Sequence, residues 1–214
     1  SDILRRALSS PSYMKEKLWQ NKDKIAQTAY HKAMEAAVRL DDLFSVSDTM
    51  LQIISYIFER LEEVTPLMLQ KLLYFVQGVS CALYKEPLLS EDCQAWVYPQ
   101  VYDMFRDFKF NPIEDARFAI LEGMEDALDE KKRRVVDLVV DTFGEYGGKR
   151  LEKITHEEKP WKIARKGYSD GIRSNEIILK ENIAAYYIKI NQKYDFSQKE
   201  GIQRYINDAL RLHV

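Results

Sequence analysis

His156 is followed directly by two glutamates, and this is the one place where a histidine of the chain has carboxylates beside it in sequence. An imidazole titrates near neutral pH, so His156 could act as a general base oriented by a carboxylate. A metal site is not expected, because adjacent residues on a helix point in different directions and the other histidines, His31 and His213, are far away in sequence. We favour a structural role, in which a ring N–H of His156 ties the loop before Pro160 to the core.

Other patterns that carry chemistry are weak. The chain has no G-x-S-x-G motif, and its glycine-rich segment 144–148 lacks the lysine of a P-loop and follows a predicted helix rather than a strand. The basic run Lys131–Arg134 could meet phosphate or an acidic partner. We prefer a solvated helix face, since acids such as Glu130 can pair with Arg134 one turn away. The sequence therefore predicts no catalytic residues, no metal and no cofactor, and an enzyme is not expected.

Composition indicates a globular protein without a broad basic surface. Of 214 residues, 46% are hydrophobic and 31% are charged, and 32 basic residues face 34 acidic ones. Direct nucleic-acid binding by this chain alone is therefore not expected. Cys81 and Cys93 form no C-x-x-C pair and are predicted to be reduced thiols. No apolar run approaches the ~20 residues that span a bilayer, and residues 1–6 lack a secretory signal, so we expect a cytoplasmic protein that does not enter membranes.

The most informative structural pattern begins at Thr65. Thr65 is suited to cap a helix and Pro66 to occupy its first position. The following residues up to about Tyr84 are apolar on more than one helical face, which predicts a helix in the middle of the core.

The remaining pattern predicts a mainly α fold: a compact multi-helix domain with room for a short pair of strands, plus an N-terminal helical extension. Residues 1–45 are assigned to the extension and 46–214 to the domain. The expected helices cover 10–20, 22–40, 47–64, 101–108, a segment from 112, one from 130 to the glycines after 143, 148–154, 160–165, 182–193 and a last one from a capping box at 197–200, and the expected strand lies within 92–98.

Several blocks in this order resemble one known family. Spread over about residues 64–190, they contain Thr65, Pro66, Gln70, Lys71, Tyr74, Gln77, Trp96, Tyr102, His156, Pro160 and Trp161. In this order and spacing they resemble the SocA-like antitoxin domain, also called the Panacea domain. The chain departs from the family after Trp96, where the segment to Tyr102 is too short for the usual Gly-Pro-Val loop.

The resemblance implies a prokaryotic or phage-encoded antitoxin that neutralises a cognate toxin by direct binding. Some members are similar to proteolytic adaptors, so a protease is an implied partner, and a homodimer remains open. Residues 1–45 look like the linker helices that follow a DNA-binding region in longer members. The alternative function is therefore a sensory or dimerisation domain of a transcription regulator whose DNA-binding part lies upstream.

Aromatic side chains beside prolines are candidates for the partner interface. Rigid aromatic side chains lose little rotamer entropy when binding buries them. This property suits Trp96, Tyr98, Tyr102 and Trp161 for contact with a toxin. The alternative, that these are buried structural aromatics, stays open.

Overall fold

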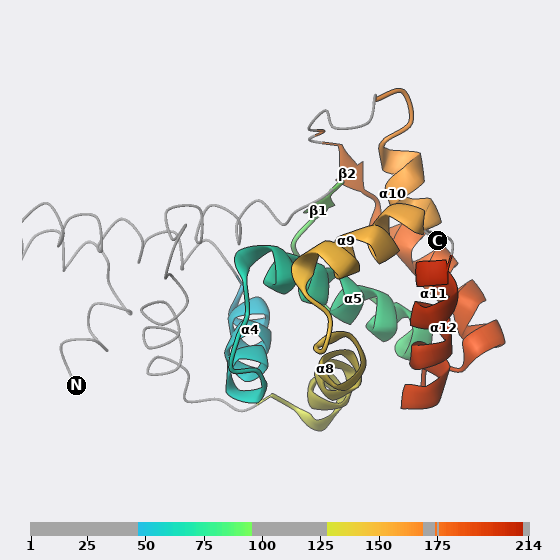
Figure 1. The fold of residues 1–214 in the computed structure, drawn as a ribbon. Helices are drawn as coiled ribbons and strands as arrows, with labels where there is room; N and C mark the ends of the chain where they lie inside the picture. The colour runs from blue at the N-terminus through green and yellow to red at the C-terminus, as the bar shows by residue number, and fades with distance from the viewer. Residues whose placement is uncertain (1–46, 96–127, 169–173, 175, 212–214) are drawn as a thin grey trace, which may run out of the picture.

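The structure, a computed structural model, describes residues 47–95, 128–168, 174 and 176–211 (Figure 1). Its elements are α4 (Asp48–Arg60), α5 (Pro66–Tyr84), β1 (Cys93–Gln94), α8 (Glu130–Phe143), α9 (Gly148–Glu157), α10 (Lys159–Ala164), β2 (Ile177–Ile178), α11 (Lys180–Tyr194) and α12 (Lys199–Arg211). The mainly α prediction is confirmed. The helices expected within 10–40, within 101–108 and from 112, and the boundary at residue 45, lie outside the described residues.

Helix α5 forms the centre of the fold, as its sequence predicts. Thr65 accepts a hydrogen bond from the backbone N–H of Met68 at 3.2 Å, Pro66 occupies the first turn, and Lys85 ends the helix with a φ of 61°. Every residue from 68 to 82 is buried. The helix is long and apolar enough to cross a membrane by length and composition, which corrects the prediction that no segment qualifies, but here its faces are covered by protein.

Helices α8, α9 and α11 pack directly against α5, while α4 packs on α8 and α12 packs on α8, α9 and α11. Figure 1 shows α5 running through the middle of this group. The ring of Phe75 stacks on Phe143 of α8, with centroids 3.9 Å apart. Gly78 allows α11 to come close, because a Cβ at this position would lie 2.3 Å from a ring carbon of Tyr187.

Helix boundaries differ from the sequence prediction in three places. Ser47 caps α4 as expected, but the helix ends at Arg60 rather than near residue 64. Helix α9 continues through His156, so that Glu158 alone separates it from α10. Before α12, the hydroxyl of Ser197 donates to Asp195 Oδ1 at 2.6 Å, and the helix begins at Lys199. These ends depend on local hydrogen bonds that apolar periodicity does not encode.

A short antiparallel sheet closes one end of the domain. Cys93 pairs with Ile178 and Gln94 with Ile177, and the backbone N–H of Ala95 donates to the carbonyl of Glu176 at 2.8 Å. The predicted strand is thus present but only two residues long. Its partner strand, β2, comes more than eighty residues later in the chain. The pairing therefore brings this later segment to the region beside α5.

Candidate functional site

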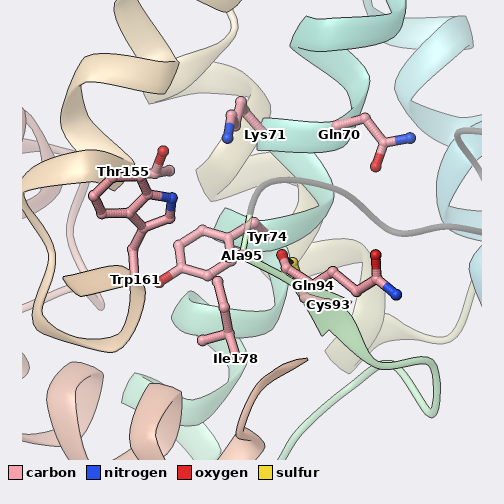
Figure 2. Close-up of a pocket in the computed structure, with 9 residues that line it drawn as sticks. All are labelled: Gln70, Lys71, Tyr74, Cys93, Gln94, Ala95, Thr155, Trp161 and Ile178. Carbon is pink, nitrogen blue, oxygen red and sulfur yellow. Dashed lines mark hydrogen bonds between the residues drawn. The ribbon is translucent and has the colours of Figure 1, made fainter. Parts of the chain in front are cut away.

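A small pocket lies between α5, α9, α10 and the two-stranded sheet (Figure 2). Its lining comprises Gln70, Lys71, Tyr74, Cys93, Gln94, Ala95, Thr155, Trp161 and Ile178. It has room for about one group the size of a water molecule. The pocket therefore suits one atom group of a ligand rather than a whole substrate.

Helix geometry explains why α5 contributes three of these side chains. Tyr74 lies four residues after Gln70 and three residues after Lys71, so its side chain shares a helical face with each of them. Trp161 comes from the first turns of α10 and lies opposite that face. Figure 2 shows the Lys71 amine and the Trp161 indole on one side of the pocket, with the amides of Gln70 and Gln94 on the other.

Behind the pocket, Glu158 is a fully buried carboxylate that joins three helices. It accepts hydrogen bonds from the hydroxyls of Tyr74 at 2.6 Å and Tyr187 at 2.8 Å, and from the hydroxyl of Tyr205. Burial raises the pKa of Glu158 to about 7, although the three hydroxyl groups and Lys71 favour its charged form. The same carboxylate and burial raise the pKa of all three tyrosines well above the ordinary value, so they remain hydrogen-bond donors.

Lys71 is a buried cation with only 3% of its surface exposed. Burial lowers its pKa, while Cys93, Glu152 and Glu158 act in the opposite direction. The ammonium group is thus held beside the pocket at a desolvation cost that its surroundings offset only in part.

His156 lies on the last turn of α9 and stacks on Trp161, with ring centroids 4.0 Å apart and an angle of 23°. Burial and Lys71 lower the pKa of His156 to about 4. The imidazole is therefore neutral at physiological pH. We expected His156 to lie in a loop and to tie it to the core through a ring N–H. Instead, His156 is helical and packs its ring face on Trp161.

The structure brings four of the family-motif residues together in the pocket: Gln70, Lys71, Tyr74 and Trp161. The others that it describes support the fold. Gln77 accepts hydrogen bonds from the backbone N–H groups of Leu88 and Leu89, both at 2.8 Å, and donates to the carbonyl of Leu89 at 3.2 Å. Pro160 is buried at the start of α10.

The proposed interface residues Trp96, Tyr98 and Tyr102 lie outside the described residues. Trp161 is half-buried on α10, close to where the sequence predicts a helix over 160–165. Its role in binding a partner stays a prediction.

Sequence reasoning missed the central position of Glu158. In the sequence, Glu158 is notable only as a neighbour of His156, and nothing local distinguishes it from an exposed acid that caps a helix. The signal that could have found it is indirect: Tyr187 and Tyr205 fall on the apolar faces of their helices, and buried tyrosine hydroxyls need acceptors.

The basic run on α8 makes ordinary surface contacts. Lys131 pairs with Glu86, and Lys132 pairs with Asp129 at 3.0 Å. Arg134 is exposed. Within the described ranges, no group of three or more His, Cys, Asp or Glu side chains could hold a metal ion, and Cys81 and Cys93 are buried without a disulfide.

Comparison with known proteins gives one match. Residues 69–162 match the family model described as antitoxin SocA-like, Panacea domain. No curated protein and no solved structure matches the chain. The resemblance predicted from the sequence blocks is confirmed for this segment, which contains most of α5, all of β1, α8 and α9, and every pocket residue except Ile178.

Proposed function

We propose, from the antitoxin SocA-like domain that residues 69–162 match, that this chain neutralises a cognate toxin by binding it directly in the cytoplasm. The family match is the observation that carries the proposal. The character of the site supports it: the buried Glu158 accepts hydrogen bonds from Tyr74 and Tyr187, and His156 is stacked and neutral. Such an arrangement suits a rigid binding module better than acid–base catalysis.

The face formed by α10 and β2 is the best candidate for the toxin contact among the described residues. These elements pack on each other, and Figure 1 shows them side by side. Four large apolar side chains on and beside them are exposed: Ile163, Tyr168, Ile177 and Leu179. Exposed apolar side chains on neighbouring elements favour a contact that is buried in a complex.

Co-expression with the product of the adjacent gene tests the proposed function. We expect that product to arrest growth when expressed alone, and this chain to restore growth and to co-purify with it. A harmless product, or one that remains toxic and unbound beside this chain, would reject direct neutralisation. Following the amount of the toxin over time would separate simple binding from the adaptor role, in which a protease removes the toxin.

A pair of substitutions tests the surface separately from the function. Ile163→Ser and Ile177→Ser should weaken toxin binding without lowering the melting temperature, because both side chains are 44% exposed. Ala185→Ser, at an exposed position of α11, is the matched control. If both Ile variants neutralise the toxin fully, the toxin contact lies on another surface, and the proposed antitoxin function still stands.

The alternative of a sensory or dimerisation domain of a transcription regulator stays a prediction. The helices at 10–40 that motivated it lie outside the described residues. A DNA-binding segment encoded upstream of residue 1 in the complete gene is the observation it requires.

A further inference from the structure

The indole N–H of Trp161 has no hydrogen-bond acceptor among the residues that the structure describes. Its Nε1 atom is shielded from solvent. Every other buried side-chain nitrogen or oxygen of the described residues has a hydrogen-bond partner. Buried donors are nearly always satisfied, because a buried donor without an acceptor keeps the full cost of its desolvation. This donor lines the pocket, so an acceptor placed in the pocket would satisfy it.

Lys71 gives the same part of the pocket a positive charge. Figure 2 shows its amine on the side of the pocket where the Trp161 indole lies. Two further cations act on these residues: Arg165 lies over the Trp161 ring, 5.1 Å from its centroid, and the charge of Lys149 lowers the pKa of both Lys71 and His156.

The nearby acids offset these charges only in part. Glu152 is paired with Lys149 at 2.9 Å, and Glu158 already accepts three tyrosine hydroxyls. Burial still lowers the pKa of Lys71 in the presence of both acids. Burial disfavours the charged form of Lys71, and an anion in the pocket would favour it, so an anionic acceptor is preferred to a neutral one.

The size of the pocket restricts the ligand further. There is room for about one oxygen-sized group, and the pocket is partly open to solvent. A carboxylate can place one oxygen inside and keep the rest of the molecule outside. We propose that the pocket between Lys71 and Trp161 binds a carboxylate, with one oxygen accepting the Trp161 indole N–H beside the Lys71 ammonium. This inference does not depend on the antitoxin function.

Indole NMR signals of the full chain, labelled with ¹⁵N, test the proposal. The sequence has three tryptophans, and the signal lost in Trp161→Phe identifies the relevant one. Sodium acetate should shift that signal in a saturable way, compared with sodium chloride at equal ionic strength. Acetamide, which has the same shape without the charge, should bind at least about tenfold more weakly, a difference of about 1.4 kcal/mol.

Lys71→Gln should weaken acetate binding by a similar factor, whereas Lys189→Gln, at an exposed position of α11, should not change it. If Lys71→Gln does not fold, the acetate and acetamide titrations of the unaltered chain decide alone. The proposal is overturned if acetate causes no shift beyond that of chloride, if acetamide acts equally, or if a folded Lys71→Gln binds acetate unchanged. The N–H would then face water only.

A second comparison distinguishes the source of the carboxylate. N-acetyl-glycyl-glycine with a free carboxyl group is titrated beside its amide. Tighter binding of the free acid than of acetate would indicate the end of a polypeptide, and binding of acetate alone would indicate a small organic acid. Either result supports a carboxylate site.

Discussion

The hydroxyl of Tyr187 donates a hydrogen bond of 2.8 Å to Glu158 Oε1, and neither residue is exposed to solvent. The same tyrosine ring lies against Gly78 of α5. One side chain of α11 therefore contacts the central helix with its ring and the start of α10 with its hydroxyl. Tyr187 thus connects residues 69–162, which match the family model, with the C-terminal helix α11.

Glu158 should make the stability of the protein depend on pH. Its folded pKa of about 7 lies above the ordinary 4.5, so the native state binds more protons than the unfolded state between these values. The free energy of unfolding must then fall as pH rises from about 4.5 to 7, by a contribution on the order of 3 kcal/mol. Glu158→Gln, which keeps the shape, should gain stability relative to the wild type over this range, measured by urea unfolding at several pH values.

Glu158→Ala is the control for this experiment. It removes the acceptor of three buried hydroxyls, so it should destabilise the protein at every pH. A constant difference between wild type and Glu158→Gln from pH 4 to 8 would show that Glu158 ionises like an exposed acid.

His156 should contribute a pH dependence of the opposite sign. Its folded pKa of about 4 lies below the ordinary 6.5, so the unfolded state binds more protons between these values and stability is lost as pH falls through this window. His156→Phe keeps an aromatic ring on Trp161 and cannot be protonated. The variant should therefore gain on the wild type as pH falls from 6.5 to 4. Because Glu158 is present in both proteins, its contribution cancels, and parallel stability curves would contradict the buried neutral imidazole.

Gly78→Ala should destabilise the protein although alanine favours helices. The new Cβ would lie 2.3 to 2.6 Å from three ring carbons of Tyr187, whose hydroxyl is fixed by Glu158. Overpacking of this kind costs about 1–3 kcal/mol and exceeds the intrinsic gain of about 1 kcal/mol. Gly147→Ala, where a Cβ meets nothing within 4 Å, is the matched control and should lose less. Equal melting temperatures for the two variants would show that α11 can move away from α5.

Phe75→Ala should cost about 3–5 kcal/mol, and Leu72→Ala about 2–5 kcal/mol, because both side chains are fully buried in the central helix. The loss for Phe75 includes its stacking on Phe143. Chemical denaturation measures both, with the exposed Ile163→Ala as control. A loss below about 1 kcal/mol would be incompatible with a central position of α5.

Tyr98→Ala and Tyr102→Ala test the partner contact that the sequence alone predicted. At an interface, each should weaken toxin binding at least about tenfold, or about 1.4 kcal/mol, with unchanged melting temperature. Lower melting temperature without a specific loss of affinity would make these side chains structural. The assay is a binding titration with the purified toxin beside a thermal melt of the free chain.

The central helix could be predicted because its signals are local and agree with one another. A capping threonine, a proline in the first turn and apolar residues on more than one face specify both where α5 begins and that it is buried. The two-residue strands could be predicted only in part. Their pairing joins Cys93 to Ile178, and such a distant contact leaves almost no periodic pattern.

The sequence by itself determined the helical class, the buried central helix and the resemblance of residues 69–162 to one family model, because periodicity, caps and ordered motif blocks are properties of neighbouring residues. Only the tertiary structure decided that Lys71 and Trp161 share a pocket and that Glu158 is the acceptor for tyrosines of three helices. A glutamate after a helix looks the same in sequence whether it is solvated or buried. Its pKa and its partners follow from the helices that pack around it, and these come from positions up to 84 residues away.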